Sequence, residues 1–325
     1  MYSSMLQEKG LVTDMTNFKN NFRSYCGMTV RNIKVYTKDK MAVLLSMLTQ
    51  IIVLGLYLMF LKSNYVDAIN SGLGDLVDLV TKADIEALVN SWLISGVIGT
   101  AVVTVALNSL SVMVSDKQER IDFDYRASSV KGGTVVMSYF SGAVASTFII
   151  SSLLLTAGFV FLAISGSFCY SLIDLLLAYG LVLLGSISGT IVLMLFISFF
   201  KKSSTLSSFG VMISAAIGFV VGAYIPVSQF SESVQTTVNL VPGSQIAGML
   251  RNVLMTPAID NIDKILGGVD KGEVAKSASE MFALKLNAFG NELDTHFMMT
   301  YTLIVIAVFI ILNVVLYRFS SKRKS

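Results

Sequence analysis

Residues 91–114 read SWLISGVIGTAVVTVALNSLSVMV, and no charged side chain interrupts them. An α-helix with a rise of about 1.5 Å per residue needs about 20 mostly apolar residues to cross the hydrocarbon core of a bilayer. Five more stretches meet this condition: 41–61, 135–164, 172–199, 207–226 and 297–317. Because lipid offers the backbone no hydrogen-bond partners, and no alternating strand pattern recurs, we predict six membrane-spanning helices.

The composition of all 325 residues supports this class. Hydrophobic residues make up 54% and charged residues 14%, against roughly 25% charged residues in a soluble domain. The chain is therefore predicted to be an all-α polytopic membrane protein, neither soluble nor disordered. A net charge of +3 is too small to indicate nucleic-acid binding. We divide the chain into a leader, 1–40, and a six-span domain, 41–325, which includes an extracellular segment, 227–296.

The distribution of Lys and Arg predicts the orientation of the chain. Cytoplasmic segments of membrane proteins carry an excess of these residues. Seventeen of the 24 fall in segments that six spans place on one side, namely 1–40, 115–134, 200–206 and 318–325. We therefore expect a multi-pass protein of the plasma (cell) membrane with both termini in the cytoplasm.

The predicted topology also places the single Trp, the single His and the two Cys relative to the membrane. Trp92 lies at the outer end of the second span, where an indole is expected at the lipid–water interface. Cys26 and Cys169 fall on opposite sides of the bilayer and should not pair. His296 lies at the outer end of the last span, where we expect a structural role.

The leader contains an amphipathic pattern. Met15, Phe18, Phe22 and Tyr25 recur at spacings of three and four residues, and polar residues fill the positions between them. Such a pattern predicts a helix that lies on the inner membrane surface. An ordinary solvated leader is the alternative.

The long outer segment divides into two parts. Its first part, 234–254, is fairly apolar but is interrupted by Pro242-Gly243, which predicts a re-entrant or interfacial pair of helices before the last span. Its second part, 258–294, is polar and is predicted to form a small helical extracellular cap. The residues expected to form the packed face of that cap are Met281, Phe282, Leu284, Phe289 and Leu293.

Small residues recur every four positions in the fifth span. They are Gly210, Ser214, Gly218 and Gly222, which would share one helical ridge. Such a ridge lets a neighbouring backbone approach closely. We expect it to serve helix packing within the chain, with dimerisation through the fifth span as the alternative.

Motifs for catalysis or metal binding are missing. No phosphate-binding GxxxxGK[ST] loop, HExxH or CxxC occurs, and Asp260 and Asp263 lack the rest of a calcium loop. We therefore expect no catalytic residue, no metal site and no enzyme activity in this chain. The centres of the spans also lack charged residues, although ion-coupled carriers usually need one at depth. Gln50 and Asn108 are the candidates to line a substrate pathway, with hydrogen bonding between helices as the alternative.

The segment between the second and third spans is the densest cluster of charges. It contains Asp116, Lys117, Glu119, Arg120 and Asp122 within seven residues. Asp116 or Ser115 can cap a short helix on the cytoplasmic side, with Glu119 in its first turn. A solvated loop is the alternative.

Three features together resemble the membrane (permease) subunit of type-2 ABC exporters. The first is RNIKVYTKDK at 31–40, leading directly into the first span, and the second is VSDKQER at 114–120. The third is GAYIP at 222–226, followed by LVPGSQ at 240–245 and by Arg251. The similarity covers nearly the whole chain, although 256–294 is longer than in a minimal member of this family.

The resemblance implies a transport complex. Two permease chains, as a homodimer or heterodimer, would assemble with separate ATP-binding subunits, which bind the ATP and Mg²⁺, so that this chain needs no cofactor. The charged segment would be the coupling helix that contacts the ATP-binding subunit. The cargo would be an amphipathic, lipidic, drug-like or peptide substrate. The alternatives are a carrier driven by an ion gradient, and a membrane scaffold or immunity protein that transports nothing.

Overall fold

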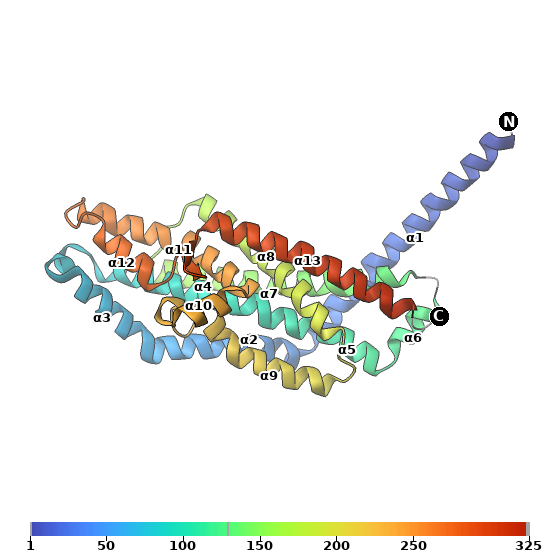
Figure 1. The fold of residues 1–325 in the computed structure, drawn as a ribbon, viewed down its shortest axis with the longest axis horizontal. Helices are drawn as coiled ribbons and strands as arrows, with labels where there is room; N and C mark the ends of the chain where they lie inside the picture. Colours follow the sequence, from blue (N-terminus) through green and yellow to red (C-terminus); the bar gives the residue numbers. More distant parts are fainter. Residues whose placement is uncertain (1, 129, 323–325) are drawn as a thin grey trace.

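The computed structural model describes residues 2–128 and 130–322, without the side chains of 2–19, Asp75, Asp122, Arg126 and 318–322. Within this part of the chain, six helices are long and apolar enough to cross a membrane, which confirms the predicted all-α polytopic class (Figure 1). Their bounds are Lys40–Leu73, Lys82–Gln118, Gly132–Ile164, Leu172–Ile197, Ser203–Val220 and Thr295–Tyr317.

The helix α4 (Lys82–Ser109) forms the centre of the bundle. It packs against α2 (Lys40–Leu56), α7 (Gly132–Ile164), α8 (Leu172–Ile197), α9 (Ser203–Val220) and α11 (Pro242–Leu266). Small residues permit this crowding. A Cβ added at Gly189 of α8 would lie 2.7 Å from the Val102 carbonyl oxygen, and one at Gly99 would lie 2.7 Å from the Ala247 Cβ. The close approach of backbones is the usual means of helix association in membranes.

The first two spanning helices extend beyond their predicted bounds at the end of the bundle opposite the termini (Figure 1). The first span continues from α2 through a π-helical turn, η1 (Tyr57–Leu61), into α3 (Lys62–Leu73). This extension is polar on one side but buries Tyr65, Ile69 and Leu73 at a spacing of four residues. After a 3₁₀ turn, η2 (Gly74–Leu79), α4 begins at Lys82 because Thr81 and Asp84 form a capping box.

Trp92 is the clearest correction to the expected outer boundary. Its side chain is fully buried, and the prediction that it lies at the lipid–water interface is therefore wrong. The indole ring lies 5.0 Å from the ring of Tyr65 and 5.5 Å from that of Phe282, measured between centroids. The segments that contain Tyr65 and Phe282 shield the indole from lipid. The apolar run at 91–114 alone gives no sign of these contacts.

The fifth span ends earlier than predicted. α9 stops at Val220, and Gly222 adopts a left-handed conformation with φ of 70°. The amides of Gly222 and Ala223 donate to the carbonyls of Phe219 and Gly218, which is the hydrogen-bond pattern of a Schellman cap. Gly222 therefore ends the helix and does not continue its ridge.

The leader forms one long helix, α1 (Tyr2–Lys38). Its second half packs on α7, where Tyr25 Oη lies 2.6 Å from Ser141 Oγ and the buried Asn32 faces Gly142. Its first half projects away from the bundle in Figure 1. The predicted helix is thus present, while its position on a membrane surface stays a prediction.

The two ends of the bundle differ in what they carry. Both termini, α5 (Ser111–Gln118) and α6 (Ile121–Ala127) lie at the right-hand end in Figure 1. The opposite end carries α3 and α12 (Glu273–Met281). Cys26 lies on α1 and Cys169 follows α7 near the other end, and both are free, as predicted.

The segment between α9 and the last helix, α13 (Thr295–Lys322), is folded against the bundle. It contains a 3₁₀ turn, η3 (Val227–Gln229), then α10 (Glu232–Asn239), α11 and α12, and a hairpin of β1 (Leu286–Ala288) and β2 (Asn291–Leu293). The beginning of α11 lies beside the middle of α4, since a Cβ at Gly243 would be 3.0 Å from Val103 Cγ2.

The last part of the predicted helical cap forms the β1–β2 hairpin instead of a helix. Phe282, Leu284 and Leu293 are buried as expected. Phe289, however, occupies the turn between the strands and is exposed, so its predicted place in the packed face is wrong. The antiparallel pairing of Ala288 with Asn291 leaves Phe289 and Gly290 as a two-residue loop.

Candidate functional site

A buried ion pair lies at the end of the bundle that carries the termini. Asp116 on α5 is almost fully buried and accepts hydrogen bonds from both terminal nitrogens of Arg31 on α1, one of them 2.8 Å from Oδ1. Tyr139 on α7 donates its hydroxyl to Oδ2 of the same carboxylate at 2.5 Å. One carboxylate thereby joins three helices that are far apart in the sequence.

Two further contacts attach α5 to the connection between α8 and α9. Lys117 Nζ donates to the Ser198 carbonyl at 2.9 Å. The Gln118 side-chain oxygen accepts from the backbone amide of Ser203 at 2.7 Å. Because α5 continues directly from α4, these contacts fix the end of the central helix against four other helices.

Hydrogen bonding and burial together determine the charge states in this cluster. The hydrogen bond to Asp116 raises the pKa of Arg31 above its ordinary value, although partial burial acts in the opposite direction. Burial also raises the pKa of Tyr125, while the charge of Arg31 opposes that rise. Arg31 therefore stays positive and balances the carboxylate, as a buried charge requires.

The exposed part of the charged segment follows immediately. Glu119 and Arg120 are exposed at the turn between α5 and α6, and Arg120 adopts a left-handed conformation with φ of 64°. On α6, Phe123 is 59% exposed and Asp124 is exposed. The side chain of Asp122 lies outside the described residues.

The structure therefore divides the predicted coupling residues into two groups. Asp116 and Lys117 make hydrogen bonds to the chain's own α1, α7 and α8 end. Glu119 and Arg120 face away from the bundle. A short helix is present as α6, but it begins at Ile121, after Glu119, and has no side-chain cap. The predicted cap at Asp116 or Ser115 is wrong, because both residues lie inside α5.

The two pathway candidates make hydrogen bonds within the bundle. Gln50 is buried, and its side-chain amide lies 2.9 Å from Thr104 Oγ1 on α4. Asn108 is half-buried and donates to the carbonyl of Thr104 in its own helix at 2.8 Å. These contacts agree with the alternative of hydrogen bonding between and along helices. A shallow apolar groove of about 350 Å³ lies elsewhere, between α1 and the start of α7, beside Phe22 and Met137.

The small residues of α9 contact other helices of the same chain. A Cβ at Gly210 would lie 3.1 Å from Leu107 of α4, and the Ser214 carbonyl accepts from Thr49 Oγ1 of α2 at 3.4 Å. Gly218 leaves room for the ring of Tyr224, which a Cβ would meet at 2.3 Å. The ridge therefore serves packing within the chain.

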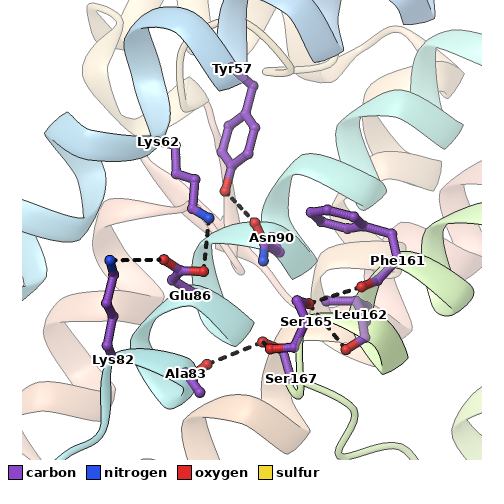
Figure 2. A network of polar contacts seen from close by, with 10 residues as sticks. All are labelled: Tyr57, Lys62, Lys82, Ala83, Glu86, Asn90, Phe161, Leu162, Ser165 and Ser167. Atoms are coloured by element: carbon purple, nitrogen blue, oxygen red, sulfur yellow. Dashed lines mark hydrogen bonds and ion pairs between the residues drawn. The ribbon is translucent and has the colours of Figure 1, made fainter.

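A second polar network lies at the opposite end of α4 (Figure 2). Glu86 is paired with Lys62 at 2.8 Å and with Lys82 at 3.8 Å. One helical turn further along α4, the buried Asn90 accepts from the Tyr57 hydroxyl at 2.5 Å, at the start of the π-helical turn. This network joins the first span and its extension to α4.

Arg251 is the residue whose position the sequence did not indicate. Predicted for the outer segment, it is fully buried in α11 and donates to the carbonyls of Val221 and Ala283, the latter at 3.3 Å. Burial lowers its pKa to about 10. Both carbonyls lie at the C-terminal ends of helices, α9 and α12, whose dipoles favour a positive charge. No acidic side chain among the described residues pairs with Arg251. The two helix ends therefore supply the negative potential that stabilises its guanidinium.

Metal binding receives no support from the geometry. Among the described residues, no group of three His, Cys, Asp or Glu side chains could hold a metal ion. His296 is exposed at the start of α13.

Comparison with known proteins gives no family assignment. No protein-family model matches the chain, and no curated protein or solved structure is significantly similar to it. The chain is thus placed only as an all-α protein with six helices long and apolar enough to span a membrane.

Proposed function

We propose that this protein is the membrane subunit of an ATP-driven exporter of the type-2 ABC class, with ATP hydrolysed by a separate subunit. Two such chains, identical or different, form the transport complex in the plasma membrane with both termini in the cytoplasm. The proposal rests on the sequence resemblance at 31–40, 114–120 and 222–251 and on the absence of charged residues from the centres of the spans.

The strongest support for the proposal is the way in which the exposed turn between α5 and α6 is connected to the bundle. An element that transmits the movement of an ATP-binding subunit needs an exposed contact surface and a rigid connection to the spanning helices. Glu119 and Arg120 offer an exposed acid and base. Asp116 and Lys117 connect the same element to α1, α7 and the end of α8.

This arrangement refines the part that each charged residue plays in the proposal. Glu119 and Arg120 contact the ATP-binding subunit, since exposed complementary charges give specific and reversible association. Asp116 and Lys117 instead transmit the movement of that contact to the helices. A buried carboxylate that is already paired with Arg31 is not available to a partner.

The cargo in this proposal is amphipathic, lipidic, drug-like or peptidic. The two pathway candidates, Gln50 and Asn108, carry no charge, and their side chains make hydrogen bonds within the bundle. Such an interior suits a cargo with extensive apolar surface better than a small ion.

The test is co-reconstitution of this chain in vesicles with the separate ATP-binding subunit that the proposal requires. We expect vanadate-sensitive ATP hydrolysis that the chain alone does not show, and ATP-dependent movement of a fluorescent amphipathic probe across the vesicle membrane. Vesicles that contain the chain and an ion gradient but no ATP are the control. Movement of the probe in these control vesicles would support a gradient-driven carrier and contradict the proposal.

A further inference from the structure

The hairpin between α12 and α13 has an unusual turn. Phe289 and Gly290 form its two-residue loop, and both have positive φ, 53° and 73°. Such loops normally carry Asn, Asp or Gly at the first position, because a larger side chain is strained there. A bulky residue in this conformation is a genuine outlier that calls for an explanation.

The packing of the hairpin does not explain the phenylalanine. Leu286, Ala288 and Leu293 of the two strands are buried against the bundle, whereas Phe289 is 73% exposed. Only its backbone is fixed, since its amide donates to Thr236 Oγ1 of α10 at 3.0 Å. The aromatic ring is therefore held outward next to α10.

The neighbouring surface is apolar as well. Leu240, directly after α10, and Phe297 of α13 are exposed. The ring of Phe297 stacks on that of Tyr301, with 6.5 Å between centroids and an interplanar angle of 12°. Phe289 is linked to these residues through Thr236, which lies one helical turn before Leu240. We call Phe289, Leu240, Phe297 and Tyr301 the outer aromatic face.

The position of this face along α13 indicates what covers it. Tyr301 donates its hydroxyl to the Leu240 carbonyl at 2.7 Å, so the end of α10 lies beside the second turn of the last span. Tyr301 is six residues into α13, roughly 9 Å along a helix with a rise of 1.5 Å per residue. The exposed Leu240 therefore lies at a depth where a membrane protein meets lipid.

Charged side chains border the tip of the hairpin. Lys285, directly before β1, and Glu292, in the middle of β2, form an exposed ion pair at 2.7 Å. Glu232, at the start of α10, lies near Gly290. An aromatic tip bordered by charged groups matches the composition of a membrane–water interface, where aromatic rings are enriched.

We propose that the outer aromatic face inserts into the outer lipid leaflet, with Phe289 as its anchor in the headgroup region. The segment between α9 and α13 is thereby attached to the membrane at a second place besides its covalent ends. This inference requires that α13 spans the bilayer, but it does not depend on the type of transporter or on any ATP-binding partner.

The test uses tryptophan fluorescence, since the only natural tryptophan, Trp92, is fully buried. In a Trp92→Phe background, Phe289→Trp is reconstituted in phosphatidylcholine vesicles with bromine on the lipid acyl chains. We expect it to lose most of its emission to lipids brominated near the headgroup, and less to lipids brominated near the chain ends. Iodide in the buffer should have little effect.

The matched control is Val269→Trp in the same background. Val269 is similarly exposed, at 67%, but lies in the turn between α11 and α12 at the far end of the molecule (Figure 1). Its emission should be quenched by iodide and not by brominated lipid. Should the Phe289→Trp chain not fold, Phe297→Trp replaces it, because Phe297 belongs to the same face and lies at the start of α13.

Two results would overturn the proposal. The first is quenching of the probe at 289 by iodide to the same degree as the probe at 269, with no effect of brominated lipid. The second is protection from both quenchers that disappears when the protein is diluted in lipid, which would assign the face to contact with a second copy of the chain.

Discussion

Ion pairs hold both ends of the rod formed by α4 and α5, but the two carboxylates differ in burial. At the end beside the termini, which we call the inner end as in the proposed orientation, the Asp116 side chain is 4% exposed and bonded by Arg31 and Tyr139. At the opposite, outer end, the Glu86 side chain is 18% exposed and pairs with Lys62, 28% exposed, and with Lys82, 82% exposed. Breaking a buried pair is costly, and the cost falls as water reaches the remaining charge. The inner end is therefore the fixed one, and the outer end can rearrange more easily.

Breaking the inner pair should have the largest effect. Arg31→Met leaves the Asp116 carboxylate buried without its cation, and we expect a loss of about 3–5 kcal/mol in the free energy of unfolding. Thermal unfolding in detergent measures the loss. The double variant Arg31→Met with Asp116→Asn removes both charges and should recover much of the stability. If the single variant is as stable as the unmodified protein, the inner end is not the fixed one.

The close packing between the two ends can be tested next. Gly189→Ala places a Cβ 2.7 Å from the Val102 carbonyl oxygen, so α8 must move away from α4. We expect a loss of about 1–3 kcal/mol, as overpacking usually causes. Gly180→Ala in the same helix is the matched control, because nothing lies within 4 Å of the added Cβ. Equal behaviour of the two variants would argue against the close contact.

Breaking the outer pair should have a smaller effect. Glu86→Gln keeps the shape of the side chain and removes its charge, and we expect a loss of about 1 kcal/mol, because Lys62 retains access to water. Lys82→Ala should change the stability by less than about 0.5 kcal/mol. Raising the salt concentration should reduce the effect of Glu86→Gln, since salt screens exposed charges. A loss as large as that of Arg31→Met would remove the contrast between the ends.

The smallest expected change is a gain in stability near Arg251. Ala283 adopts a left-handed conformation with φ of 51° at the end of α12, where its carbonyl accepts from Arg251. Because glycine adopts this conformation without strain, Ala283→Gly should stabilise the protein by about 0.5–1 kcal/mol. Chemical unfolding of the two proteins side by side measures the difference. A destabilised variant would show that the methyl group contributes more by its packing.

The sequence predicted what depends on local composition. Long apolar runs identified the six spans, and Pro242-Gly243 indicated the break before α11. Partners far apart in the chain could not be predicted. Arg31 and Asp116 are separated by 85 residues, and nothing in a charged segment distinguishes a buried carboxylate from a solvated one. Trp92 and Arg251 were misplaced for the same reason, since polar outer segments fold over both.

Phe289 and Gly222 show a second limit. A helical pattern predicts that an apolar residue such as Phe289 faces the core, yet a two-residue turn directs it outward. Gly222 matched the spacing of the ridge in α9 but ends the helix. In both cases the local backbone conformation overrides the spacing of residues, because a turn breaks the helical period on which the pattern depends.

In the proposed complex, energy from an ATP-binding subunit enters at the inner end of the rod through Glu119 and Arg120. The most direct measurement is ATP hydrolysis by the reconstituted complex when these two charges are reversed by Glu119→Lys with Arg120→Glu. The control is the outer reversal, Lys62→Glu with Glu86→Lys, and both chains are matched for yield and unfolding temperature. We predict that the inner reversal abolishes the stimulation of hydrolysis by this chain, while the outer reversal preserves it. Full stimulation with the inner reversal would contradict the account.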